Sequence, residues 1–189
     1  MTDTTQTDLL TAEDLLALPI GQGERYELIE GELHTMSPTG LPHGFLAMEF
    51  GSEIRNYVRK HRLGIVTSAE TGFIIRPDTV RVPDVAFIPK ARLPEGDVPS
   101  GFGTVAPALV VEVISPNESA PYVQRKTQTW LDFGVDEVWN VYSEEKTVAV
   151  FVATEDGAHY RTYGPGDTLT SAALPGLSLA LDDLFNAAR

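Results

Sequence analysis

The residues best suited to chemistry are a buried carboxylate, two further carboxylates and a lysine. Glu112 stands inside the segment ALVVEVIS (108–115), in which nearly every other residue is apolar. An apolar run without alternation is typical of a strand that is covered on both faces, where an unpaired charge is too costly to keep. Glu112 therefore needs a structural partner or belongs to a functional site.

Asp84 and Glu70 fall in the two strands predicted just before this central strand. In VRVPDVAF, alternation places Asp84 on an otherwise apolar face. If the loop between the two strands has three residues, Ile75 pairs with Thr79. That register places Glu70 directly opposite Asp84, with about 5 Å between their Cβ atoms. A two-residue loop would break the pairing.

Three carboxylates on adjacent strands repel one another unless a cation lies among them, and a divalent ion with oxygen ligands fits such a group. That ion can polarise a phosphoryl oxygen and generate hydroxide from water. Lys126 lies on the next predicted helix, 14 residues beyond Glu112. There it can stabilise charge on a phosphorane or orient the attacking water.

Each of these residues also has a simpler interpretation. A single Asp or Glu in a strand usually pairs with an arginine or caps a turn. Lys126 alone fits a solvated helix position, and His43, near the start of a predicted helix, fits a cap or the surface.

Composition excludes several classes of site. The chain has 189 residues, which predicts one domain over 1–189 with residues 1–10 frayed. It has no cysteine and four histidines, none spaced for a zinc site, so a metal would be a hard cation on carboxylates. No apolar run or leader pattern indicates a membrane partner, and we expect a cytoplasmic protein.

The charge is unevenly distributed. The net charge of −13 opposes a broad nucleic-acid surface, but residues 41–92 hold eight Lys and Arg against five Asp and Glu. The run RNYVRKHR (55–62) lies at a predicted helix C-terminus, where the dipole favours cations in any case. A nucleic-acid contact by this run is the alternative.

Hydrophobic periodicity predicts a mixed α/β sheet with helices on its faces and additional β-hairpins. We expect a short helix between Thr11 and Pro19, and a hairpin around Glu30-Gly31. A long helix over about 42–61 should bury Leu46, Phe50, Ile54 and Tyr57 or Val58. GIVTSAETGFII and VRVPDVAFI are predicted strands, and residues 93–104 a functional or mobile loop. A helix from about 121 ends at Gly134, and a second hairpin turns at 144–146.

At this point the residues resemble a known family. VPD followed by VVEVISP is similar to the PD-(D/E)xK core of the restriction-endonuclease-like superfamily, and the whole of about 24–185 resembles the Uma-two family of bacterial endonucleases. The resemblance rests on motifs that occur in order: YELIEGEL, MSPTGLPHG, AETGF, RVPDVAF, LVVEVISP, Lys126, GVDEVWNV and LPGLSL.

The resemblance implies a mixed central sheet flanked by helices and a phosphodiesterase that uses Mg²⁺ or Mn²⁺. Asp84 and Glu112 would be the metal ligands and Glu70 a further acid. The superfamily lysine two residues after the glutamate is Ile114 here, and Lys126 matches a lysine moved to the following helix. Family members often have Asp where this chain has Tyr122, which puts the arrangement around Lys126 in question.

The sequence leaves three functions open. The first is a metal-dependent endonuclease acting on DNA, which predicts that the basic part of 41–92 faces the same cleft as Asp84. The second is a nuclease-fold binding module, favoured if Arg76, Arg81 or Arg125 neutralises the carboxylates. The third is a glycosidase with two acids, which lacks a sugar-stacking aromatic cluster. A homodimer is a further expectation, because cutting both strands commonly takes two subunits, and Trp130 or Phe102 fits either an interface or the core.

Overall fold

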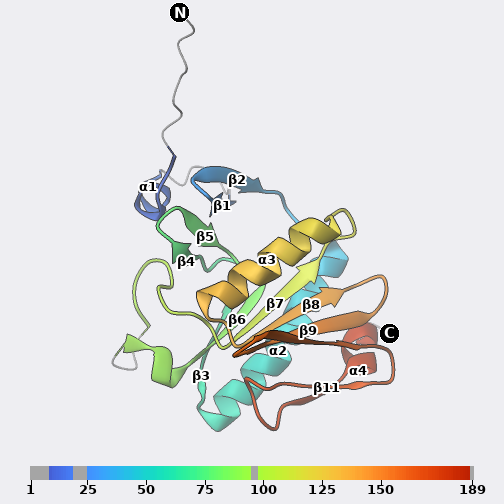
Figure 1. The fold of residues 1–189 in the computed structure, drawn as a ribbon. Coiled ribbons are helices and arrows are strands. Elements are labelled where there is room, and N and C mark those ends of the chain that lie inside the picture. Colours follow the sequence, from blue (N-terminus) through green and yellow to red (C-terminus); the bar gives the residue numbers. More distant parts are fainter. Residues whose placement is uncertain (1–8, 19–24, 95–97, 188–189) are drawn as a thin grey trace, which may run out of the picture.

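The computed structural model describes residues 9–18, 25–94 and 98–187. A six-stranded mixed sheet forms the centre, and smaller sheets lie beside it (Figure 1). The elements in chain order are α1 (Ala12–Ala17), β1 (Arg25–Ile29), β2 (Glu32–Met36), α2 (Leu41–His61), β3 (Gly64–Ser68), β4 (Phe73–Arg76), β5 (Thr79–Arg81), β6 (Val85–Pro89), the 3₁₀ turn η1 (Lys90–Arg92), β7 (Leu109–Ile114), α3 (Ala120–Phe133), β8 (Glu137–Tyr142), β9 (Thr147–Thr154), β10 (Gly157–Tyr163), β11 (Thr168–Thr170), β12 (Ser178–Ala180) and α4 (Leu181–Asn186).

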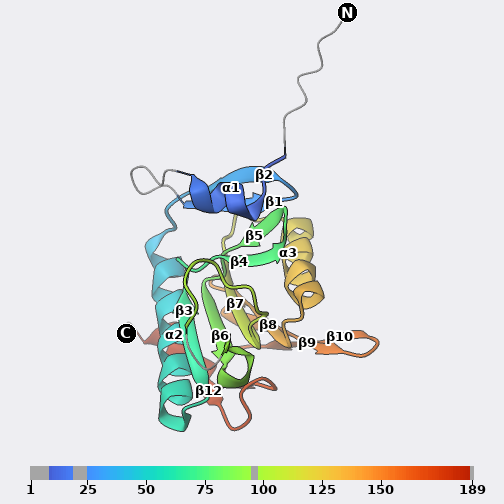
Figure 2. The same ribbon diagram turned by 90° about the vertical axis from the view of Figure 1, so that its left-hand side faces the viewer.

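The six-stranded sheet has the order β10-β9-β8-β7-β6-β3. β7 runs parallel to β8, while every other neighbouring pair is antiparallel. α2 and α3 cover opposite faces of this sheet (Figure 2). All six residues of β7 are buried, so the predictions of a central buried strand and of a mixed sheet flanked by helices are confirmed.

The two long helices follow from their apolar rows. α2 buries Leu46, Phe50, Ile54 and Val58, as the spacing predicts. α3 ends at Gly134, which adopts the left-handed conformation (φ 99°) that favours glycine after a helix. Among the described helices, none combines the length and the apolar character that crossing a membrane requires.

The N-terminal elements also match the prediction where the structure describes them. Thr11 caps α1 through a reciprocal pair of bonds with Asp14. The β1–β2 hairpin turns at Glu30-Gly31, and the predicted terminator Pro19 lies outside the described residues. The predicted frayed segment lies mostly outside them too, but the Leu10 N–H donates to the Gly31 carbonyl, so Leu10 is held.

The two strands predicted over 64–75 and 80–88 are each two strands in different sheets. β3 and β6 belong to the central sheet, whereas β4 and β5 belong to a four-stranded sheet of order β2-β1-β5-β4. The second break falls at Pro83, which has no N–H to donate to a ladder. Arg76 pairs with Thr79 across a two-residue turn, so the predicted Ile75–Thr79 pair is wrong, but an irregularity after Ile74 restores the predicted register at Ile74–Val80 and Phe73–Arg81.

Candidate functional site

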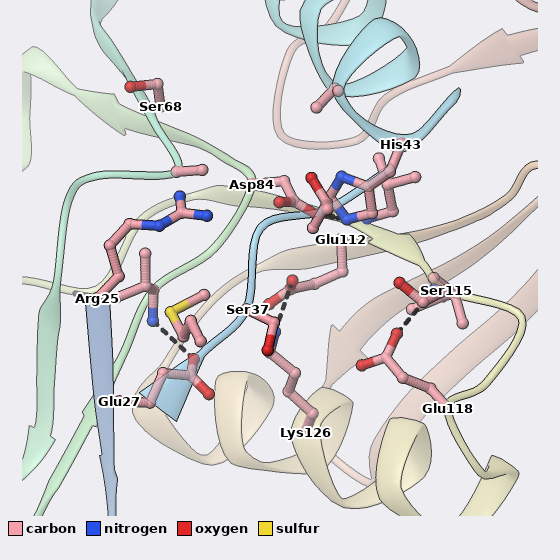
Figure 3. Close-up of a pocket in the computed structure, with 18 of the residues that line it drawn as sticks. Arg25, Glu27, Ser37, His43, Ser68, Asp84, Glu112, Ser115, Glu118 and Lys126 are labelled. Carbon is pink, nitrogen blue, oxygen red and sulfur yellow. Dashed lines mark hydrogen bonds and ion pairs between the residues drawn. The ribbon is translucent and has the colours of Figure 1, made fainter. Parts of the chain in front are cut away.

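A cavity of about 610 Å³ opens at the C-terminal end of β7 (Figure 3). Its walls come from the β1–β2 hairpin, the first turns of α2, the end of β3, the end of β7 and the start of α3. Asp84, Glu112 and Lys126 all line it. The fold thus brings three of the four predicted site residues to one place.

Glu112 is held on both carboxylate oxygens by side chains of α3. Lys126 Nζ lies 2.8 Å from Oε2, and the Trp130 indole N–H donates to Oε1 over 2.8 Å. The side chains of Glu112 and Lys126 are only 6% and 13% exposed. The buried glutamate therefore has partners, and Trp130, which is fully buried, belongs to the core rather than to an interface.

Burial also changes the acidity of this pair. Desolvation raises the pKa of Glu112 to about 7; Lys126 opposes this shift, while Asp84 and Glu27 add to it. Burial alone would lower the pKa of Lys126, but the negative charge of Glu112 outweighs burial and raises it. Lys126 therefore stays a cation, and Glu112 changes charge near neutral pH.

Asp84 lies on the other side of the β7 end, between the sheet and α2. The Val113 backbone N–H donates to Asp84 Oδ2 over 2.8 Å, which fixes this carboxylate beside the residue that follows Glu112. His43 Nε2 lies 3.3 Å from the same oxygen. Burial would lower the pKa of His43, but the carboxylates of Asp84, Glu112 and Glu118 together raise it above its ordinary value.

Glu70 does not lie opposite Asp84. It falls in the turn after β3, where Ser68 pairs with Val85 and the strand ends. Its side chain is 71% exposed and accepts a hydrogen bond from Arg25 at 3.0 Å. The predicted register does hold at Ile74–Val80 and Phe73–Arg81, because an irregularity after Ile74 offsets the shorter turn. The ladder ends at these residues, however, so neither Glu70 nor Asp84 lies in it.

Two residues of the site were not singled out by sequence reasoning. Glu27 is buried, accepts hydrogen bonds from Arg81 at 3.0 Å and from the Val82 N–H at 2.9 Å, and lines the cavity. Alternation in RYELI groups it with Arg25, a pattern typical of a solvated face. The position of His43 near a helix start fits a cap or the surface, yet β6, the antiparallel neighbour of β7, begins directly after Asp84 and brings this carboxylate to His43.

The cations of the site are not those expected from the charge distribution. No Lys or Arg of residues 41–92 lines the cavity; its lining cations are Arg25 and Lys126. The prediction that the basic stretch faces the same cleft as Asp84 is therefore wrong. Arg81 neutralises Glu27, whereas Glu112 pairs with Lys126 and Asp84 lies beside His43.

The carboxylate pair fits a magnesium or manganese ion. Mg²⁺ commonly takes one or two protein carboxylates and completes its shell with water and substrate phosphate. Asp84 and Glu112 supply such oxygens on either side of the β7 end, inside an open cavity. Within the described residues, no group of three or more His, Cys, Asp or Glu side chains is placed to hold an ion by itself.

Trp130→Phe is expected to lower the free energy of unfolding by about 2 kcal/mol, because a buried hydrogen bond to a charged acceptor is lost. Trp139 is the matched control, since its indole donates to the buried carboxylate of Glu137 over 2.8 Å. Urea unfolding of the two Trp→Phe variants should give similar losses. A negligible loss for Trp130→Phe alone would mean that Glu112 does not depend on this bond.

The fold and the site together define a mixed α/β protein with a carboxylate pair at the end of its central strand, in which Glu112 is buried and Asp84 is partly exposed. The family model described as "Putative restriction endonuclease" (Uma2) matches residues 12–182. The chain therefore belongs to the Uma2 family, which confirms the resemblance to the Uma-two proteins found in its motifs.

A solved structure shares the fold. The crystal structure titled as a putative nuclease belonging to DUF820 from Anabaena variabilis matches with a TM-score of 0.78 and 23% identity. The match covers 94% of this chain and 98% of the other. At this identity the likeness concerns the fold alone. Among curated proteins, none matches the chain.

Proposed function

We propose that this protein is a divalent-metal-dependent endonuclease that hydrolyses phosphodiester bonds in DNA. The observation that supports it best is Glu112, a glutamate kept in the most buried strand yet reaching an open cavity beside Asp84. Its family membership supports nucleic-acid cleavage as the class of reaction. Mg²⁺ or Mn²⁺ is the proposed cofactor, held by Asp84 and Glu112.

The chain's own residues would act through charge and position. A bound divalent cation would polarise a phosphoryl oxygen and make water more acidic. Lys126, held at the cavity wall by Glu112, would donate a hydrogen bond to a phosphate oxygen as negative charge grows there. The bond from the Val113 N–H would keep Asp84 oriented during this step. Glu70 has no part in the proposal, since its carboxylate is exposed and paired with Arg25.

The test is cleavage of supercoiled plasmid by the purified chain with Mg²⁺ or Mn²⁺. We expect cleavage with either ion, and none with a chelator, because neither carboxylate can take the place of the cation on a phosphate. Glu112→Ala run beside the wild type should abolish cleavage. A nicked product would indicate one strand cut at a time, and a linear product would support the homodimer.

The second candidate, a nuclease-fold binding module without catalysis, is favoured by one observation. The cavity's lysine is already committed to Glu112, and no arginine of 41–92 reaches the cavity. Plasmid left intact by every ion, with duplex binding retained, would support the binding module. Cleavage that survives Glu112→Ala would contradict the assignment of the site.

A further inference from the structure

A second feature of α2 lies at the end remote from the cavity. Arg55, Arg59 and Arg62 line a hollow of about 350 Å³ together with Val58 and the start of β3. All three arginines are exposed. Among the residues that the structure describes, the arginines that form ion pairs are Arg25, Arg76, Arg81 and Arg92, so these three are free of such partners.

The helix dipole explains this cluster only in part. It favours cations in the last turn, where Arg59 lies, but Arg55 is more than a turn further back. Arg62 follows the helix in the left-handed conformation (φ 55°), a position where glycine is the usual residue. The acidic residue nearest in the helix, Glu53, lies about 150° around the axis from the middle of the arginine row.

The hollow and the carboxylate cavity share one flank of α2. Gly44 and Met48 line the cavity, and Arg55 and Arg59 follow them at helical spacing on the same side. β3 runs alongside α2, from the hollow to the cavity (Figure 2). Gly64, Ile65 and Val66 of this strand line the hollow, whereas its last residue, Ser68, lines the cavity.

The cavity by itself is poorly charged for holding a polyanion. Its carboxylates are Glu27, Asp84, Glu112 and Glu118, whereas its two permanent cations, Arg25 and Lys126, are both in ion pairs. The whole chain has a net charge of −13. A DNA substrate drawn to this cavity therefore needs its phosphates neutralised elsewhere on the protein.

We propose that the arginine hollow is a second contact for the DNA backbone, and that the substrate is a duplex long enough to reach from the cavity to it. This inference rests on the proposed function. At 1.5 Å per residue, Arg55 to Arg62 lie about 18–28 Å along the helix from His43. That distance corresponds to roughly 5–8 base pairs at 3.4 Å each. A rigid duplex holds phosphates at such a fixed separation.

The experiment compares two double variants with the same change in charge. Arg55→Gln/Arg59→Gln alters the hollow, whereas Lys146→Gln/Arg161→Gln alters the β8–β9 turn and β10, at the other end of the sheet from β3. Binding to fluorescent DNA hairpins is followed by anisotropy in chelator, at several salt concentrations. One hairpin has a 5-base-pair stem, about 17 Å long, and the other has 15 base pairs, about 51 Å long. Thermal melts establish that both variants fold.

We expect Arg55→Gln/Arg59→Gln to weaken binding to the 15-base-pair hairpin roughly 10- to 100-fold and to reduce the salt dependence by about two counterions. The 5-base-pair hairpin is too short to reach both contacts and should bind the wild type much more weakly than the 15-base-pair hairpin. The control variant should bind both like the wild type. Equal weakening by the two variants would overturn the proposal, since only net charge would then matter. So would equal binding of the two stems by the wild type, or the same loss on a 15-nucleotide single strand.

No weakening of DNA binding by either variant would also overturn it, and would indicate a different occupant such as an acidic protein. Because binding is measured without metal, it is independent of cleavage. A protein that binds duplex through the hollow but cuts no DNA would contradict the nuclease proposal alone.

Discussion

Asp84→Asn is expected to slow DNA cleavage at least about 100-fold while the protein stays folded. Asparagine has nearly the shape of aspartate, and its amide oxygen can still accept the Val113 N–H. What it lacks is the negative charge that would hold a divalent cation beside Glu112 and face His43. Initial rates of plasmid nicking at saturating Mg²⁺ measure the effect.

Glu53→Gln is the control for the loss of one carboxylate, because Glu53 is exposed on α2 and remote from the cavity lining. It should cut at the wild-type rate. Calorimetric titration of Mn²⁺ gives a second readout, in which Asp84→Asn should bind the ion much more weakly than Glu53→Gln. Wild-type cleavage by Asp84→Asn would show that Asp84 is not a ligand, and the proposed metal site would fall with it.

The sequence was informative about the central elements because their signals are local. An unbroken apolar run predicts β7, and apolar residues three and four apart predict the buried side of α2. Glu112 stands out because it is a charged residue in an apolar strand, and Asp84 stands out because it lies on an otherwise apolar face. These residues are indeed brought together at the cavity.

The relations between distant segments were not predictable in the same way. The β4–β5 ladder keeps the predicted register but stops at Phe73 and Arg81, and the chain belongs to the central sheet before and after it, which removed Glu70 from the group. Glu27 and Arg81 lie 54 residues apart and meet only because β1 pairs with β5 in a sheet that no local pattern indicates. The first turn of α2 lies at the cavity, so His43 is next to Asp84, whereas the arginines near the other end of this helix lie far from Asp84. The sequence does not show in which direction the helix crosses the sheet.

Lys126→Met is expected to destabilise the folded protein strongly. Removing one partner of a buried ion pair leaves the other charge uncompensated, which typically costs 3–5 kcal/mol. We expect a loss of about that size in the free energy of unfolding above neutral pH, where Glu112 must either carry an uncompensated charge or keep a proton, and retains only the Trp130 bond. Urea unfolding followed by tryptophan fluorescence measures it.

The pH dependence of this loss follows from the acidity of Glu112. Between its ordinary pKa of 4.5 and about 7, folded wild-type protein keeps a proton that the unfolded chain releases, so stability falls as pH rises by about 1.4 kcal/mol per unit. Above about 7, Glu112 ionises in the folded protein as well and the fall stops. Above about 7 Lys126 is charged as well, because the negative charge of Glu112 raises the pKa of Lys126.

In Lys126→Met, the positive charge that lowers the pKa of Glu112 is absent, so the pKa of Glu112 lies above 7. The free energy of unfolding of the variant therefore continues to fall above pH 7, where that of the wild type no longer changes. The difference in the free energy of unfolding between wild type and variant should therefore increase between about pH 7 and pH 9. Lys126→Met/Glu112→Gln removes the titrating group but keeps an amide oxygen for Trp130, and should lack this slope. A gap that stays constant with pH in Lys126→Met would mean that Glu112 finds another cation or solvent when Lys126 is gone. The buried ion pair would then not be what keeps Glu112 ionised at the end of β7.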